Sequence, residues 1–309
     1  MVEITRPSKF ALSVNSPVII AAGVAGYGNH YHSLVKLSKV GALVTNPVTY
    51  HGWSPARGTR VIPLENGVLV HTGFPSAGLA SVVKEFRSVW ATAPLPIILH
   101  LIATQPADLR AAAALLDRED SIAAVELGLP DDIGVERAVD FVATMTRATE
   151  KPVIVRLPMY DAYEIAGPCA DAGAGALVVC APPRGTARDP HSGRLVSGRV
   201  YSPMIQPLAL RMVGVLRKRI DADVPIIGAG GIHSLQDARD FIDAGAAAVQ
   251  VDSVLWIQPN ILERIARDLS GGLTTRMVNA MPDEWHADMG DTEFEELFGS
   301  DDEPAQGTR

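Results

Sequence analysis

The stretch PIIGAGGIHS at residues 225–234 decides how this chain folds. Its first residues continue a short apolar run, Val224–Gly228, whose lack of alternation predicts a strand that is buried on both faces. A glycine pair follows at once, and Ser234 then stands where a helix over Leu235–Ala244 would need its N-cap. A buried strand, a glycine turn and a capped helix together make one unit of a parallel α/β fold.

The same unit recurs through the chain. Further apolar runs predict buried strands at Pro17–Ala22, Ala42–Thr45, Pro96–Ile102, Ala123–Leu127, Val153–Leu157, Ala176–Cys180 and Ala247–Val251. Further helical stretches lie at Pro106–Leu116, Val135–Arg147, Tyr160–Ala172, Met204–Arg219 and Pro259–Leu269. Eight strands with helical returns predict a (β/α)8 barrel of the TIM type, and a doubly wound open sheet is the alternative.

Length and composition bound the class of protein. The chain has 309 residues, of which 47% are hydrophobic and 20% charged, and this suits one barrel of roughly 250 residues with extensions. No apolar run approaches the roughly 18 residues that a membrane span needs, and the N-terminus lacks the pattern of a secretory signal. Two cysteines are too few for a disulfide framework, and no metal-ligand spacing stands out. We therefore expect a cytoplasmic protein without a metal site or a membrane anchor.

The negative charge is concentrated at one end of the chain. Residues 283–309 hold ten acidic side chains and one arginine, a net charge of −9 that leaves +1 of the total −8 for the rest. Neither part offers the concentrated positive charge that binding of nucleic acid requires. We predict a barrel over residues 1–275 and an acidic tail over residues 276–309. The spacing of Phe294, Leu297 and Phe298 would let one helical turn contact a partner protein, and a solvated tail is the alternative.

Two long connections interrupt the alternation of strands and helices. Residues 46–80 and 181–203 are rich in glycine, proline or threonine and are long for βα connections. Loops that follow the strands of a barrel belong to the face that carries the active site. We therefore expect both segments to cover the functional end of the barrel.

The glycine pair also predicts an anion site. Gly230 and Gly231 have no side chains, so their amides can approach a phosphate closely, and a helix begins just beyond them. The last strand ends at Asp252 and Ser253, and a phosphate between the loops after strands seven and eight is a recurrent barrel arrangement. The Asp252 carboxylate would repel such an anion unless it points away. A tight turn that binds nothing is the alternative for the two glycines.

The order of these segments resembles the dihydroorotate dehydrogenase family. The resemblance runs in colinear order through roughly residues 10–270 and is carried by PVIIAAGVAGYG at 17–28, GALVT at 41–45, VEL at 125–127, PVIVRL at 152–157, PMIQPLALRMV at 203–213, GAGGI at 228–232 and the segment at 245–253. It implies an FMN-binding barrel of the soluble class that oxidises a CH–CH group, with a link to pyrimidine metabolism and a homodimeric assembly.

The resemblance also implies site residues. Cofactor contacts fall at Ala22, Gly23, Asn46, Arg156, Gly230, Gly231, Asp252 and Ser253. Substrate contacts fall at Thr72, Ser76 and Ala181, and the catalytic candidates are Asp131 and His71. Asp131 stands where the family has a catalytic cysteine, and it would act as a base only if its surroundings favoured the protonated form. A turn that caps the next helix is the alternative for Asp131, and a structural or solvent-facing histidine is the alternative for His71.

The chain departs from the family at the substrate positions. A family lysine is replaced by Asn46, another by Arg156, and family asparagines are replaced by Val70, Ser76, Gly128 and Ala181. Each hydrogen bond lost to a buried polar substrate costs about 1–3 kcal/mol, so several losses together should abolish recognition of dihydroorotate.

Three hypotheses follow from this pattern. The first is an FMN-dependent oxidoreductase that acts on a different small molecule and passes electrons to a soluble acceptor or a partner subunit. The second is a flavin-less barrel that acts as a binding or scaffold subunit, motivated by Asn46, Ala181 and Asp252. The third is a lyase or isomerase that holds a phosphate-bearing ligand in the same anion site.

Overall fold

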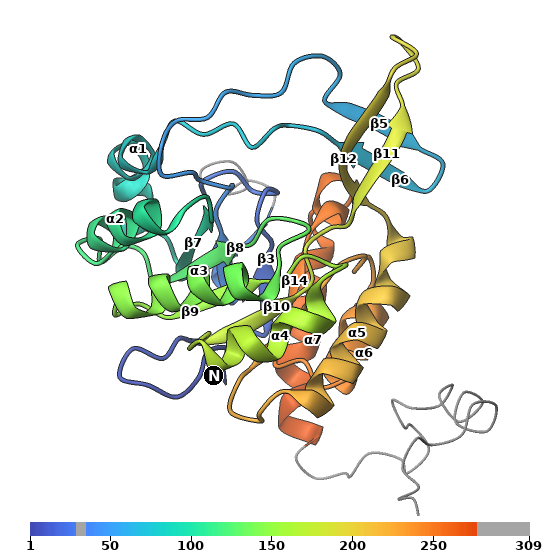
Figure 1. Cartoon of the computed structure of the whole chain (residues 1–309). Coiled ribbons are helices and arrows are strands. Elements are labelled where there is room, and N and C mark those ends of the chain that lie inside the picture. Colours follow the sequence, from blue (N-terminus) through green and yellow to red (C-terminus); the bar gives the residue numbers. More distant parts are fainter. Residues whose placement is uncertain (29–34, 277–309) are drawn as a thin grey trace, which may run out of the picture.

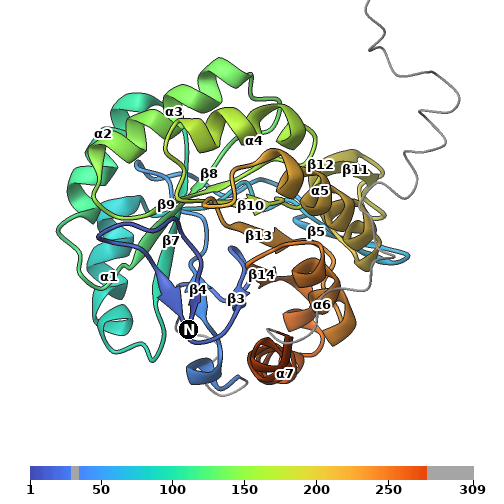
Figure 2. The same ribbon diagram turned by 90° about the horizontal axis from the view of Figure 1, so that it is seen from below.

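Eight parallel strands close into a barrel, which confirms the predicted (β/α)8 fold and excludes the open sheet (Figures 1 and 2). The computed structural model describes residues 1–28 and 35–276. For residues 271–276 it describes only the backbone. The barrel strands, in their order around the ring, are β3 (Val18–Ile20), β4 (Ala42–Val44), β7 (Ile97–Ile102), β8 (Ala124–Gly128), β9 (Val153–Arg156), β10 (Ala176–Val179), β13 (Ile226–Ala229) and β14 (Ala248–Val251).

Helices follow the barrel strands and cover their outer faces (Figure 2). They are α1 (Leu79–Ala91), α2 (Pro106–Leu116), α3 (Val135–Ala148), α4 (Ala162–Asp171), α5 (Gln206–Arg219), α6 (Leu235–Asp243) and α7 (Ile261–Arg276), with short 3-10 turns η1 (Leu37–Lys39), η2 (Pro203–Ile205) and η3 (Ser253–Trp256). All the predicted helices are present, and α1 is an additional one. The predicted N-cap is confirmed, because the Ser234 hydroxyl accepts the Asp237 N–H at 3.1 Å in a capping box.

The barrel strands are mostly apolar, as expected for strands whose two faces are both buried. One hydrophobic cluster fills the barrel interior and includes Ile19, Ile98 and Ile227. A larger cluster lies between the strands and the helices. The interior cluster also contains Ile4 and Val14, from the N-terminal segment that pairs β1 (Val2–Glu3) with β2 (Ser13–Val14). That segment closes the end of the barrel near the N-terminus and leaves the opposite end for a site (Figure 1).

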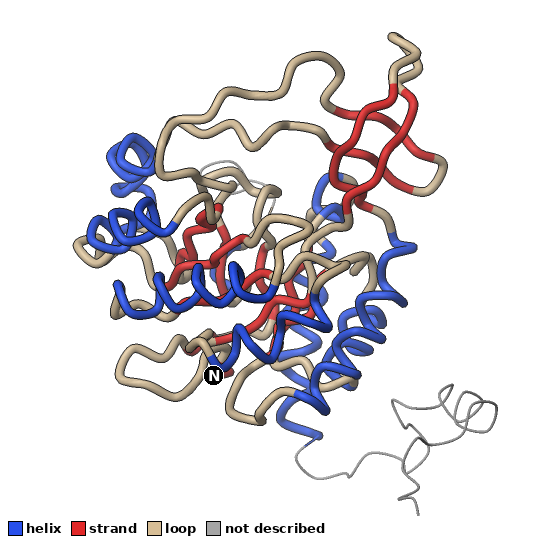
Figure 3. The backbone as a smooth tube through the Cα atoms, in the orientation of Figure 1, coloured by secondary structure: helices blue, strands red, loops and turns tan. Residues whose placement is uncertain are grey.

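The two long connections contain β-strands. Parts of them form a four-stranded antiparallel sheet in the order β11 (Arg184–Arg188), β12 (Leu195–Tyr201), β6 (Gly67–Val70) and β5 (Val61–Leu64). This sheet stands above the barrel, at the end away from the N-terminus, as Figure 3 shows. The pairing of β12 with β6 joins segments that are more than a hundred residues apart, so no local pattern in the sequence indicates it.

The described residues contain neither a membrane-spanning helix nor a cluster of metal ligands. Within residues 1–28 and 35–276, no helix is long and apolar enough to cross a membrane. Over the same ranges, no group of three or more histidine, cysteine or acidic residues is placed to hold a metal ion. The predicted acidic tail lies outside the described residues apart from Arg276 at its start.

Candidate active site

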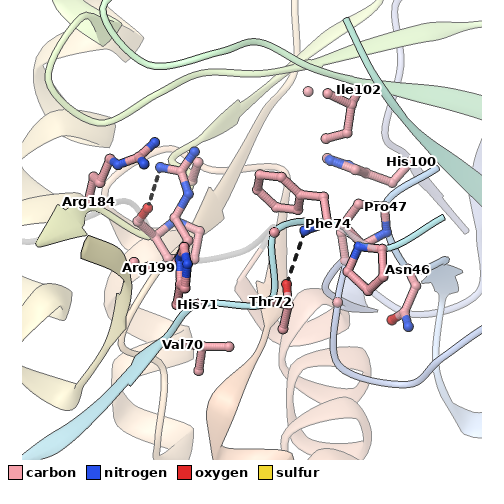
Figure 4. Close-up of a pocket in the computed structure, with 18 of the residues that line it drawn as sticks. Asn46, Pro47, Val70, His71, Thr72, Phe74, His100, Ile102, Arg184 and Arg199 are labelled. Atoms are coloured by element: carbon pink, nitrogen blue, oxygen red, sulfur yellow. Dashed lines mark hydrogen bonds between the residues drawn. The ribbon is translucent and has the colours of Figure 1, made fainter. Parts of the chain in front are cut away.

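A cavity of about 450 Å³ lies where the barrel strands end, beneath the four-stranded sheet. Its floor comes from residues at or just after the ends of strands, namely Ala22, Gly23, Asn46, Pro47, His100, Ile102, Gly128, Leu129, Arg156 and Ala181. Its cover comes from the two long connections, with Val70–Pro75, Arg184, Ser197–Arg199 and Tyr201. Figure 4 shows His71, Arg184 and Arg199 on one side of this cavity and Asn46, Pro47 and His100 on the other.

A buried polar network forms the centre of the floor. Glu126 on β8 is fully buried, and its Oε1 lies 2.7 Å from His100 Nδ1 on β7 and 3.3 Å from Arg156 Nη1 on β9. Arg156 Nη1 also donates to Gln250 Oε1 on β14 at 3.0 Å. The Gln250 amide nitrogen donates in turn to the second oxygen of Glu126. Four barrel strands are therefore joined through one carboxylate.

The network keeps Glu126 ionised. Burial by itself would raise the pKa of this carboxyl, but the hydrogen bond from His100 and the positive charge of Arg156 outweigh it and lower the pKa to about 2. The ionised carboxylate compensates the guanidinium of Arg156, which is itself only 5% exposed. Arg156 can therefore stay charged at the cavity floor without an unpaired charge in the barrel.

His100 is a candidate functional residue that the sequence analysis missed. Its ring packs against Gly128, where a Cβ atom would stand 2.6 Å from His100 Nε2, so a family asparagine at this position would displace the ring. Because Nδ1 faces Glu126, Nε2 is the nitrogen left to meet a ligand in the cavity. The signal was present in the sequence, since His100, Glu126 and Gln250 are single polar residues inside apolar strands.

Asn46 lines the floor of the cavity and has one unsatisfied polar atom. Its Oδ1 is buried and has no hydrogen-bond partner among the described residues. A buried acceptor without a donor costs free energy. Asn46 is therefore the residue of the cavity wall whose side-chain oxygen lacks a donor in this structure.

Most of the predicted site residues line the same cavity. Ala22, Gly23, Asn46, Arg156, His71, Thr72 and Ala181 all belong to its wall. Ser76 does not belong to the wall, because its hydroxyl accepts the backbone N–H groups of Thr49 at 3.2 Å and Gly78 at 3.1 Å. The Ser76 side chain therefore holds a turn together in this structure.

Asp131 lies beside the cavity and is bound by arginines. Its Oδ1 accepts from Arg199 Nη1 at 2.7 Å, and its Oδ2 lies 3.6 Å from Arg184 Nη1. Both arginines line the cavity, whereas Asp131 stands behind them. The direct contribution of Asp131 in this structure is to hold the two guanidinium groups, and its predicted role as a base remains a prediction.

The predicted phosphate residues form a second group, outside the cavity wall. Ser253 Oγ lies 3.3 Å from His233 Nε2, which joins the loop after β14 to the loop after β13. Asp252 does not point away from this meeting point, because its Oδ1 accepts both the N–H and the hydroxyl of Ser253. The carboxylate is buried, and this burial raises its pKa. The end of the site that would hold a phosphate therefore already contains an acidic side chain.

A closed (β/α)8 barrel with a cavity at the ends of its strands and a glycine turn after β13 has the arrangement of TIM barrels that bind their ligands at this end. Comparison with known proteins narrows this class. The family model for dihydroorotate dehydrogenase matches residues 8–273. The catalytic subunit of dihydroorotate dehydrogenase B (NAD(+)) from Pelobacter propionicus is 32% identical over 288 residues, which cover 88% of this chain and 94% of the relative. The same subunit from Geobacter metallireducens is 31% identical over 84% of this chain and 89% of the relative.

The chain belongs to the dihydroorotate dehydrogenase family, whose members are FMN-dependent oxidoreductases. The floor of the cavity fits the ring of this cofactor, because a flavin ring presents an N–H group and carbonyl oxygens. Asn46 and Arg156 both line the floor, and an amide and a guanidinium are groups that can pair with such ring atoms. The phosphate end fits less well, since Asp252 places a carboxylate there.

Proposed function

We propose that this chain is an FMN-dependent oxidoreductase whose substrate is not dihydroorotate. The observation that supports this proposal is the apolar substrate wall. Val70, Gly128 and Ala181 line the cavity at positions where the resemblance implies amide side chains, and the Ser76 hydroxyl is committed to the backbone. A polar ring held by several amides would lose most of its hydrogen bonds here.

The substrate class that fits the cavity is a small organic acid with an apolar body. Arg184 is half-exposed and lies farther from Asp131 than Arg199 does, so its guanidinium is available to a carboxylate group. Val70, Phe74 and Ile102 supply apolar surface in the same cavity. The acid group would lie under the sheet, while the body of the substrate would lie over the barrel floor.

Two histidines are placed to exchange a proton with this substrate. His71, which the sequence analysis proposed as a catalytic candidate, lines the cover of the cavity. His100 lines the floor, and Glu126 fixes its Nδ1, so Nε2 is free to accept or donate. When bound, FMN would take up the hydride equivalent from the substrate carbon. The residues of this chain would then hold the acid group and move the proton.

The electrons must leave through another molecule. The relatives named above are catalytic subunits of an enzyme named for NAD(+), and we propose that this chain likewise works with a partner subunit. We also propose that the chain forms the predicted homodimer and that its acidic tail contacts the partner subunit. Deleting residues 283–309 should reduce co-purification of the partner, and unchanged co-purification would remove the tail from this role.

The test uses the purified full chain reconstituted with excess FMN. We expect the visible absorption bands of bound flavin, no anaerobic bleaching by dihydroorotate, and bleaching by at least one member of a panel of small organic acids. His71→Asn and His100→Asn should slow bleaching while the bands of the oxidised flavin stay in place. Bleaching by dihydroorotate at rates typical of an enzyme would contradict the proposed substrate change. A protein that takes up no flavin would instead favour the scaffold hypothesis.

A further inference from the structure

The loops after β13 and β14 meet each other and the start of α5 in a region that we call the cup. The register of the two strands pairs Ala229 with Gln250, so the residues that follow each strand emerge side by side. His233 and Ser253 then contact each other across the cup at 3.3 Å. The start of α5 forms a third wall, because a Cβ atom on Gly231 would stand 2.4 Å from the backbone nitrogen of Gln206.

The Asp252 carboxylate occupies this cup. Its Oδ1 accepts the backbone N–H of Ser253 and also the Ser253 hydroxyl, the latter at 3.1 Å. Asp252 and Ser253 are only 4% and 5% exposed, so water does not screen the acidic group. A backbone N–H and a hydroxyl at the end of a strand are the donors that a bound phosphate would use. In this chain the Asp252 carboxylate accepts both of these hydrogen bonds.

We propose that Asp252 is an internal anion that takes the place of a ligand phosphate, so that this chain does not distinguish FMN from riboflavin. This inference rests on the proposed function for the flavin ring and goes beyond it for the phosphate. A phosphate ester carries between one and two negative charges at neutral pH. Its repulsion by a carboxylate about 4 Å away in a partly desolvated site is enough to weaken binding about 100-fold. The phosphate of FMN therefore adds no affinity, and the ring and ribityl chain carry the binding.

The experiment compares the affinities of FMN and riboflavin by quenching of flavin fluorescence. The proteins are the wild-type full chain, Asp252→Gly, Asp252→Asn and the control Glu150→Gln, which removes an exposed carboxylate in the turn after α3. We expect the wild type and Glu150→Gln to bind the two flavins with similar Kd. Asp252→Gly should bind FMN about 100-fold more tightly than riboflavin, with the riboflavin affinity unchanged, and Asp252→Asn should lie between them.

A second measurement separates the cup from the ring site. Inorganic phosphate should raise the Tm of Asp252→Gly and Asp252→Asn and leave the Tm of the wild type unchanged. If no variant binds either flavin but phosphate still stabilises the two Asp252 variants, the proposed function fails and the role of Asp252 stands. A wild type that prefers FMN about 100-fold over riboflavin overturns the inference. Variants that gain neither phosphate stabilisation nor a preference for FMN overturn it as well.

Discussion

Replacement of Glu126 by glutamine tests the central network of the barrel. The Glu126→Gln side chain keeps the shape of glutamate but loses the charge that compensates Arg156. Breaking a buried ion pair by removing one partner costs about 3–5 kcal/mol. The shifted pKa gives an independent value, because a fall from 4.5 to about 2, at 1.36 kcal/mol per pKa unit, corresponds to about 3 kcal/mol. Both routes predict a loss of unfolding free energy of about 3 kcal/mol at neutral pH.

The pH dependence follows from the direction of this shift. The pKa of Glu126 is lower in the folded state, so its stabilisation is fully present above pH 4.5 and is lost as the pH falls toward 2. The difference in unfolding free energy between the wild type and Glu126→Gln should therefore be constant from neutral pH down to about pH 5 and shrink below that. Urea unfolding followed by circular dichroism at a series of pH values measures it.

A surface carboxylate supplies the matched control. Glu150 is exposed in the turn after α3, so Glu150→Gln should change the unfolding free energy by less than about 0.5 kcal/mol at any of these pH values. The reasoning is refuted if Glu126→Gln costs less than about 1 kcal/mol at neutral pH, or if its cost does not decrease below pH 4.5. Either result would mean that the carboxylate does not compensate a buried charge.

Three further predictions concern packing and reactivity. Gly231 and Gly193 share a φ of +68°, but of these two only Gly231 has no room for a Cβ atom. Gly231→Ala should therefore lower the Tm clearly more than Gly193→Ala does. Equal losses of Tm would contradict the predicted clash. Burial raises the pKa values of Cys169 and Cys180 to about 12, so neither thiol should react with a thiol reagent near neutral pH until urea unfolds the chain, and rapid labelling of the native protein would disagree. Ser234→Ala should cost about 1 kcal/mol in urea unfolding by removing the cap of α6, and an unchanged midpoint would show that the capping box is dispensable.

The candidate site was only partly readable from the sequence. The resemblance pointed to Asn46, Arg156, His71 and Ala181, and the structure brings all of them to one cavity wall. The hydrogen-bond partners of the site residues could not be predicted from the sequence. Hydrogen bonds between strands that are far apart in the chain depend on the register of the closed barrel. Glu126 illustrates the point, since its partners come from three other strands.

The local patterns of the amino-acid sequence were sufficient to predict the barrel. Apolar runs, glycine turns and helix caps act over a few residues, so the order of strands and helices could be predicted without knowing any distant contact. Long-range packing decided that two distant connections pair as β6 and β12, that His100 packs over Gly128, and that the Asp252 carboxylate accepts the Ser253 N–H in the cup. Each of these depends on which groups the closed barrel brings within a few ångströms, and a linear pattern of residues does not encode that.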